Sequence, residues 1–305
     1  MMKLRNTIFI SSMVILLSAC SDNDEVMTPA PPVRHAISLS TVAIGMSRAA
    51  NVAVDLQDAQ FVSGSTISVQ VTDNAATSPE IYSPCTYTAD GVGGLTTTNA
   101  QFYPISGSTI DLYAFHPADA GETFTVQSDQ STPENYRASD LMHATATGLS
   151  YSETPHELTF YHLLSKVVVK LEPGTGFTVA DLDGATVVLG TAAEGEGLNN
   201  QVTFNAATGT ISVATGDQAI TVTTDADNAE HAAVIVPQNI KGKKLFVTLS
   251  GVTKPWTITS DAETFPLEAG KVYVFTITVN RSGLSVSVTI QPWATGENAT
   301  GDITF

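Results

Sequence analysis

The chain has 305 residues and a formal net charge of −17, and charged residues make up only 14% of it, well below the roughly 25% usual for soluble domains. Thirteen Lys and Arg face thirty Asp and Glu, which excludes nucleic acid as a partner because phosphate binding needs a basic face. The length suffices for two domains. With only two cysteines, the fold must be held by its core and not by disulfides.

The first residues predict export to the cell surface. Lys3 and Arg5 precede a mostly apolar stretch at 8–17, too short for a membrane-spanning helix, which needs about 20 apolar residues. Leu-Ser-Ala then leads to Cys20. This pattern predicts a lipoprotein signal peptide at 1–19 and lipid attachment at Cys20. The acidic cluster at 21–25 resembles the short tag that sends lipoproteins of some Gram-negative anaerobes to the outer leaflet, and this resemblance implies a mature chain tethered to the cell outer membrane. An ordinary secretory signal that ends in cysteine and a buried apolar strand are the alternatives.

The signal is followed by a predicted linker at 20–35. It begins with an acidic cluster at 21–25 and carries three prolines within 28–32. Such a composition favours an extended, solvated segment.

From there on, short apolar runs alternate with clusters of Gly, Asn, Asp, Thr and Ser. Alternation with period two, which buries one face of a strand, is clearest at 66–71, 109–115, 244–249 and 284–290. The stretch 156–171 predicts one continuous apolar strand, with a helical turn at Leu163–Leu164 as the alternative. No long segment has helical periodicity, so we expect an all-β chain of sandwiches, with domains at 36–155 and 156–305.

The sequence offers no clear catalytic or metal site. His156 and His162 are six residues apart; on a strand that is one face but ~20 Å, too far to share a metal. Residues 181–184 begin like a calcium loop but lack its later ligands, so we interpret them as a turn. For Cys85 a structural thiol is favoured over a catalytic nucleophile. We expect no enzyme, cofactor or metal, although two carboxylates far apart in sequence would still suit a glycan-processing enzyme.

Three stretches carry a family resemblance. The first is 47–49 ahead of 60–69, the second is 139–142 leading to 158–167, and the third runs from 236–238 through 267–273 to 290–293. By their order, spacing and position behind a lipoprotein signal, the chain resembles the fimbrillin family, the subunits of type V pili of Gram-negative anaerobes. Ser63-Gly64-Ser65 departs from the family, whose members often carry an acidic residue after the glycine, and this affects only a turn.

The resemblance implies two tandem transthyretin-like β-sandwich domains and assembly by strand exchange. A precursor strand at 36–48 would fill a groove in the N-terminal domain. An arginine-specific protease would cut between Arg48 and Ala49, and a strand from a neighbouring subunit would replace it. An arginine in an exposed loop is the alternative interpretation of Arg48.

The pattern within the precursor strand changes phase. Ile37 and Leu39 share one face, whereas the other face carries Val42, Ile44 and Met46. The change predicts a bulge or a bend near Ser40 and Thr41.

The candidate donor strand lies near the C-terminus. Its apolar face is formed by Leu284, Val286, Val288 and Ile290, followed by Trp293. Burying the four aliphatic side chains contributes about 6–12 kcal/mol gross, and main-chain pairing with an open sheet edge is added to this. The alternative is that this segment completes the sheet of its own domain.

Together these features predict a structural or adhesive subunit of a surface pilus. The alternative is a permanently lipidated pilus anchor or surface adhesin that does not polymerise. The partners of the protein would be other pilus subunits, the outer membrane through the lipid, and a host or glycan ligand. Trp256 and Trp293 are candidates for stacking on sugars, although packing in a core or an interface is the favoured interpretation of both.

Overall fold

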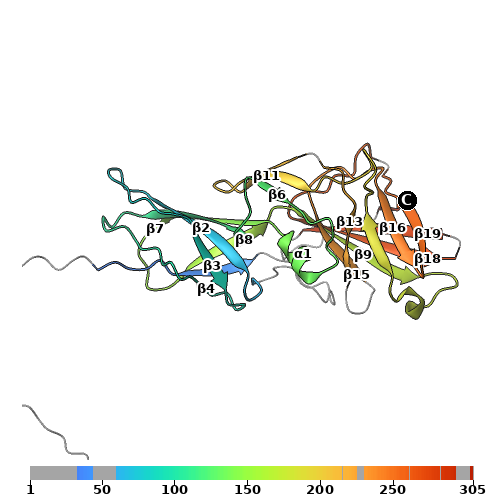
Figure 1. Cartoon of the computed structure of the whole chain (residues 1–305), viewed down its shortest axis with the longest axis horizontal. Coiled ribbons are helices and arrows are strands. Elements are labelled where there is room, and N and C mark those ends of the chain that lie inside the picture. Colours follow the sequence, from blue (N-terminus) through green and yellow to red (C-terminus); the bar gives the residue numbers. More distant parts are fainter. Residues whose placement is uncertain are drawn as a thin grey trace, which may run out of the picture. The chain divides into compact units, whose positions relative to one another are not determined.

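The computed structural model describes residues 33–43, 60–214, 216–224, 230–260, 262–281, 283–292 and 303–304. These residues form four β-sheets (Figure 1), which confirms the predicted all-β class. The described helical segments are two short ones, α1 (Pro133–Ala138) and η1 (Val179–Leu182). Neither has the length and apolar character that a membrane span requires.

One sheet contains the N-terminal strands. In spatial order it has seven strands: β1 (Leu39–Ala43), β8 (His156–His162), β7 (Met142–Leu149), β5 (Ile110–His116), β2 (Thr66–Asp73), β3 (Cys85–Ala89) and β4 (Leu95–Thr96). β1 is parallel to β8, and the other neighbours are antiparallel. The predicted strands at 66–71 and 109–115 are confirmed as β2 and β5.

The remaining strands form three sheets. The six-stranded sheet has the order β14 (Thr223–Thr224), β15 (Glu230–Ile235), β9 (Ser165–Pro173), β18 (Lys271–Asn280), β19 (Gly283–Pro292) and β20 (Ile303–Thr304). The four-stranded sheet has the order β13 (Ile220–Thr221), β10 (Thr186–Leu189), β16 (Lys244–Leu249) and β17 (Val252–Thr257). The three-stranded sheet has the order β12 (Thr210–Val213), β11 (Gln201–Asn205) and β6 (Thr123–Thr125). The predicted strands at 244–249 and 284–290 are confirmed as β16 and β19.

The prediction of one continuous strand at 156–171 is wrong. The segment is two strands in different sheets, β8 and β9, joined at Leu163 and Leu164, which form no helical turn. Leu164 is fully buried, and its carbonyl oxygen accepts a hydrogen bond from the Gly270 N–H at 2.8 Å. The apolar run is unbroken because the joint itself lies in a core, so hydrophobicity alone does not reveal that the sheet changes.

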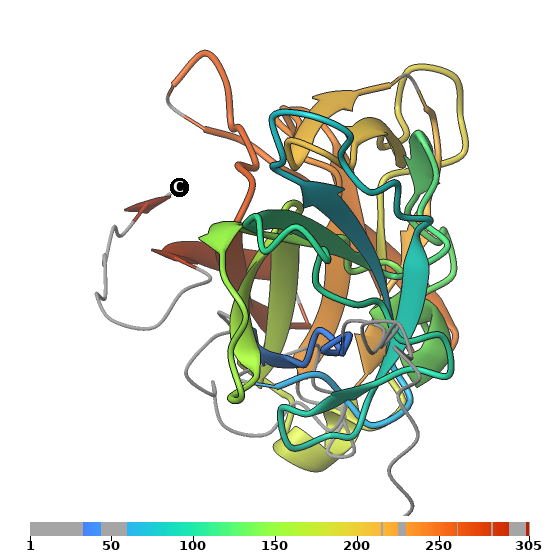
Figure 2. The same cartoon turned by 90° about the vertical axis from the view of Figure 1, so that its left-hand side faces the viewer.

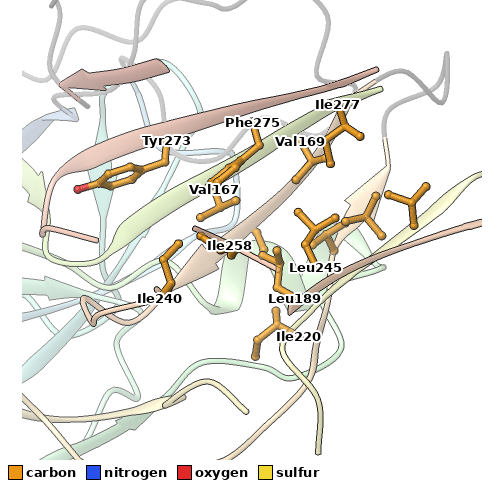
Figure 3. Close-up of a cluster of buried hydrophobic side chains, with 14 of the residues drawn as sticks. Val167, Val169, Leu189, Ile220, Ile240, Leu245, Ile258, Tyr273, Phe275 and Ile277 are labelled. Atoms are coloured by element: carbon orange, nitrogen blue, oxygen red, sulfur yellow. The ribbon is translucent and has the colours of Figure 1, made fainter. Parts of the chain in front are cut away.

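The largest core fills the space between the six-stranded and four-stranded sheets. Side chains of β9 and β18 face those of β10 and β16, as Figure 3 shows for Val167, Val169, Phe275, Leu189 and Leu245. This is the face-to-face arrangement of a β-sandwich. A second core is enclosed by the seven-stranded sheet.

A third core lies on the other face of the six-stranded sheet. There Val168, Val234 and Val274 meet residues that come from earlier in the chain, among them Phe124 and Tyr136. β6 also pairs with β11, so contacts join the two halves of the chain. The chain leaves the seven-stranded sheet between β8 and β9, and the division at residue 155 stays a prediction.

Gln130 closes the outer edge of the six-stranded sheet. Its side chain is fully buried and donates to the Val234 carbonyl oxygen while accepting from the Val234 N–H, both at 2.8 Å. One side-chain amide therefore satisfies the N–H and the carbonyl group of Val234, with which a further strand would otherwise pair. Such a contact blocks the edge of the sheet at this residue.

We expect Gln130→Leu to lower the free energy of unfolding by about 2–4 kcal/mol, because both backbone groups of Val234 lose their partner in a buried site. Urea denaturation of the purified chain measures this. Gln218→Leu, at an exposed position, is the matched control and should stay within about 0.5 kcal/mol of the unmodified chain. Equal unfolding midpoints for the two variants would show that Gln130 does not cap the edge.

Candidate functional site

The segment from His35 to Ala43, hereafter the resident strand, lies between two strand edges. On one side β1 pairs in parallel with β8 over five residues, and the His156 N–H donates to the Ser38 carbonyl oxygen at 2.9 Å. On the other side Ile37 and Thr41 donate to the carbonyl oxygens of Gln101 and Gly93, each at 2.8 Å. The resident strand therefore fills a gap between β8 and the stretch 93–103.

Its inward side chains belong to the N-terminal core. Ile37, Leu39 and Thr41 are 4%, 3% and 2% exposed, and the two aliphatic ones belong to the core that also contains Phe61 and Phe160. Burying two aliphatic side chains contributes about 3–6 kcal/mol gross. Because the floor of the gap is apolar, removal of the resident strand would expose this core to water.

The predicted bulge near Ser40 and Thr41 is wrong. The pairing with β8 has one continuous register from Leu39 to Ala43, and burial alternates without a break through Thr41. The sequence suggests a change of phase because a threonine, and not an aliphatic residue, occupies the third inward position. Ile44 and Met46 lie outside the described residues.

Thr41 is the weak point of the resident strand. Its Oγ1 is buried without a hydrogen-bond partner among the described residues, and such a group costs about 1–3 kcal/mol. Nearby, Gly93 has a φ of +96°, and a Cβ there would lie 3.3 Å from the Thr41 carbonyl oxygen. A glycine therefore permits the close approach of the two backbones at this point.

We expect Thr41→Val to stabilise the intact chain by about 1–2 kcal/mol, because valine has nearly the same shape and lacks the unpaired hydroxyl. The measurement is the unfolding midpoint in urea. Thr145→Val, on an exposed position of β7, is the control and should change little. A destabilised Thr41→Val variant would mean that the hydroxyl has a partner, such as an ordered water.

The start of the resident strand is held by side chains. The Arg34 guanidinium forms an ion pair with the Glu80 carboxylate, and its Cζ lies 5.5 Å from the centre of the Phe102 ring. We call Glu80 and Phe102 the guanidinium seat. His35 stacks on Tyr151 with ring centres 4.1 Å apart.

The guanidinium seat is held in place by groups outside the resident strand. Glu80 Oε1 accepts a hydrogen bond from the Ile105 N–H at 2.8 Å, and the Tyr82 hydroxyl donates to the Phe102 carbonyl oxygen at 2.8 Å. Burial, followed by the charges of Glu80 and Asp73, raises the pKa of Tyr82 to about 12. The Tyr82 hydroxyl therefore keeps its proton and remains a donor at neutral pH.

β19 lies in the six-stranded sheet, antiparallel to β18 (Figures 1 and 2). Val288 is buried, whereas Leu284, Val286 and Ile290 are half-buried against the core of the sandwich. β20 pairs with β19 only at Ser287 and Val288. The four predicted donor residues thus share one face, and within their own subunit that face is only partly covered.

Three of the predicted site residues, Cys20, Arg48 and Ala49, lie outside the described residues, as does Trp293. The lipid attachment and processing predictions therefore stay predictions.

The other candidates for chemistry have structural contacts. The Cys85 thiol is buried and lies 3.0 Å from the Asn99 carbonyl oxygen. His162 Nδ1 lies 2.7 Å from the buried Asp140 carboxylate. Burial lowers the pKa of His116, whose Nδ1 lies 2.8 Å from the Thr66 carbonyl oxygen.

The candidates for metal binding and sugar stacking also have structural contacts. In the part of the chain that the structure describes, no three His, Cys, Asp or Glu residues are grouped to hold a metal ion. Asp181 instead accepts hydrogen bonds from the Thr178 N–H and hydroxyl, both at 2.7 Å, which lowers its pKa. The Trp256 ring packs edge-on against Phe275 at 6.1 Å, in agreement with the packing interpretation.

No pattern in the sequence predicts that Arg34, Glu80, Phe102 and the stretch 93–103 are parts of this site. The only signal in the sequence is the arginine three residues before Ile37. Glu80 and Phe102 come from loops, whose spatial neighbours are not encoded by any periodic pattern.

The sandwich fold and an N-terminal strand held between two strand edges define an all-β protein. The fimbrillin-like family model matches residues 48–293, and the chain belongs to this family, as the sequence predicts. The family is structural and adhesive, not enzymatic.

The chain is also similar to individual proteins. The chain is 27% identical over 300 residues, 92% of each sequence, to a Bacteroides uniformis protein named "Putative fimbrium subunit Fim1C". Crystal structures of two proteins described as "putative cell adhesion protein" share its fold. The one from Bacteroides uniformis has a TM-score of 0.66 and 24% identity, covering 86% of this chain and 98% of that protein. The one from Bacteroides ovatus has a TM-score of 0.65 and 18% identity, covering 87% and 100%.

Proposed function

We propose that the chain is a structural or adhesive subunit of a surface pilus, made as a precursor anchored to the outer membrane by a lipid on Cys20. A protease cuts the precursor after Arg48 and removes the resident strand. Strand exchange with a second subunit then joins the two. Membership of the fimbrillin-like family and the relationship to a protein named as a fimbrium subunit support this function.

The observation that carries the proposal is the position of the resident strand. It is bonded on both sides and contributes Ile37 and Leu39 to the core. Cleavage after Arg48 leaves these residues without a covalent link to the rest of the domain. Once they leave, an apolar gap remains between two open strand edges, and a strand with alternating apolar residues is the group that repairs both defects.

β19 has the properties that such a replacement requires. Its four apolar residues share a face, as the strand geometry demands, and three of them are only half-buried at home. Transfer into the gap would bury the surface that Leu284, Val286 and Ile290 leave exposed in the free subunit, whereas Val288 is already buried there. The gain is about 25 cal/mol for each Å² of apolar surface removed from water.

We expect Arg48→Lys to abolish filaments, because lysine keeps the charge but does not fit an arginine-specific protease. The measurement is N-terminal sequencing of the protein recovered from cells, together with electron micrographs. Unmodified chains from filaments should start at Ala49, and the variant should remain blocked at Cys20 and membrane-bound. Arg137→Lys, at a half-buried position on α1, is the control and should process normally.

Two outcomes would overturn this account. Normal filaments of Arg48→Lys would exclude processing at this residue. If unmodified chains are found only in the form blocked at Cys20, the protein is a lipidated anchor or adhesin that does not polymerise.

A further inference from the structure

The resident strand and β19 share a sequence pattern that includes a cation. Arg34 precedes Ile37 by three residues, and Arg281 precedes Leu284 by three residues. Apolar or β-branched residues follow at the same intervals, Leu39 and Thr41 in one segment and Val286 and Val288 in the other, as the printed sequence shows.

We infer that the guanidinium seat fixes the register of strand exchange: it binds Arg34 before processing and Arg281 of a second copy afterwards. This inference rests on the proposed function and adds the contact that determines the register. In this register Leu284 takes the place of Ile37, and Val286 that of Leu39.

The seat suits a second guanidinium because it does not depend on the first. Glu80 is bonded to the Ile105 N–H, and Phe102 is held through its carbonyl oxygen by Tyr82. When Arg34 leaves, a carboxylate and an aromatic face remain in position. This pair of groups binds a guanidinium through charge and through the ring face.

Arg281 already makes the same kinds of contact within its own subunit. Its Cζ lies 5.8 Å from the centre of the Phe177 ring, and its Nε donates to the Gly176 carbonyl oxygen at 3.0 Å. Arg281 itself is exposed, at the turn that leads into β19. The charge of Arg281 also contributes to lowering the pKa of Asp181. Moving Arg281 to the seat therefore exchanges one half-buried aromatic ring for another, and the nearby Asp181 carboxylate for that of Glu80.

Exposed apolar side chains flank both partners. Ile81, next to Glu80, is 97% exposed, and Ile105, whose N–H binds Glu80, is 59% exposed. Near Arg281, Val179 is 65% exposed and Phe177 is half-buried. Two different patches of one chain thus match in charge and in apolar character, which is the arrangement of a head-to-tail contact that propagates into a polymer.

The register also removes the defect at Thr41. Val288 would occupy the inward position where the Thr41 Oγ1 is buried without a partner among the described residues. Valine and threonine have nearly the same shape, so the exchange removes an unpaired hydroxyl without opening a cavity. This difference favours the incoming strand over the resident one.

Charge reversal in cells tests the seat. Glu80→Arg and Arg281→Glu should each reduce the subunit recovered in filaments by about tenfold or more, because each brings like charges together. The double variant should restore the yield to within about twofold, since the pair is re-formed with opposite orientation. Glu80→Gln, which keeps the shape without the charge, should give a smaller loss of about fivefold.

Arg34→Glu is the matched control. It breaks the ion pair of the precursor, but residue 34 is absent from a subunit cut after Arg48, so filament yield should be unchanged. Thermal melting of each purified variant separates assembly defects from misfolding. If a charge-reversal variant does not fold, the filament yield of Glu80→Gln is used in its place to test the seat.

The outcomes separate this inference from the proposed function. If unmodified chains form filaments starting at Ala49 but the single reversals do not reduce the yield, the seat is excluded and strand exchange stands. Failure of the double variant to recover would also exclude the pairing. If the unmodified chain forms no processed filaments, the proposed function itself is wrong, and so is the role of the guanidinium seat that rests on it.

Discussion

Val286→Asp is expected to abolish filament assembly while leaving the free subunit folded. At home Val286 is half-buried at the side of the sandwich, so a carboxylate there can still reach water. In the groove the same side chain would point into the apolar core that Leu39 now fills, where an unpaired charge costs several kcal/mol, and about 4 kcal/mol is roughly a thousandfold in equilibrium constant.

The assay is sedimentation of processed subunits followed by electron microscopy, with a melting curve to check the fold. Ser287→Asp is the control, because Ser287 is exposed at home and lies on the opposite face of the strand. It should assemble nearly normally. Filaments of normal length from Val286→Asp would show that this face of β19 is not buried between subunits.

Leu39→Ala is expected to destabilise the precursor by about 2–5 kcal/mol, the range for truncating a fully buried leucine. Leu39 is 3% exposed and stands in the middle of the resident strand, so its loss weakens the hold of the whole segment. Hydrogen exchange in β8 and in 93–103 should therefore accelerate, because these are the two edges that the resident strand covers.

Ser38→Ala, at the exposed neighbouring position, is the comparison and should leave that exchange unchanged. If β8 and 93–103 are as well protected from hydrogen exchange in the Leu39→Ala variant as in the unmodified chain, the resident strand does not cover these two edges. The effect is local, so protection in β9 and β18 should be the same in both variants.

The strands that alternate cleanly are predictable from sequence. β16 begins and ends at the residues given by the pattern of 244–249, and the ends of β2, β5 and β19 differ from the predicted ends by at most two residues. One face of each is buried, so the period of two is preserved in the sequence. The pattern fails between β8 and β9, where a buried joint is as apolar as the strands around it.

Other features depend on contacts that no local pattern encodes. α1 is too short for helical periodicity, although Thr132 followed by Pro133 is a typical start signal. The burial of Thr41 is not expected from its type. The guanidinium seat brings Glu80 and Phe102 together with Arg34 through loops. The sequence alone therefore predicts the apolar residues of the proposed exchange, but not the group that we propose to align them.

The structure of the assembled filament by electron cryomicroscopy tests the central claim most directly. Between β8 and the stretch 93–103 of each subunit, the account predicts density for residues 284–290 of a neighbouring copy, with Val286 at the place of Leu39. Density for residues 37–43 of the same chain in that gap would contradict it, because the groove would then never open.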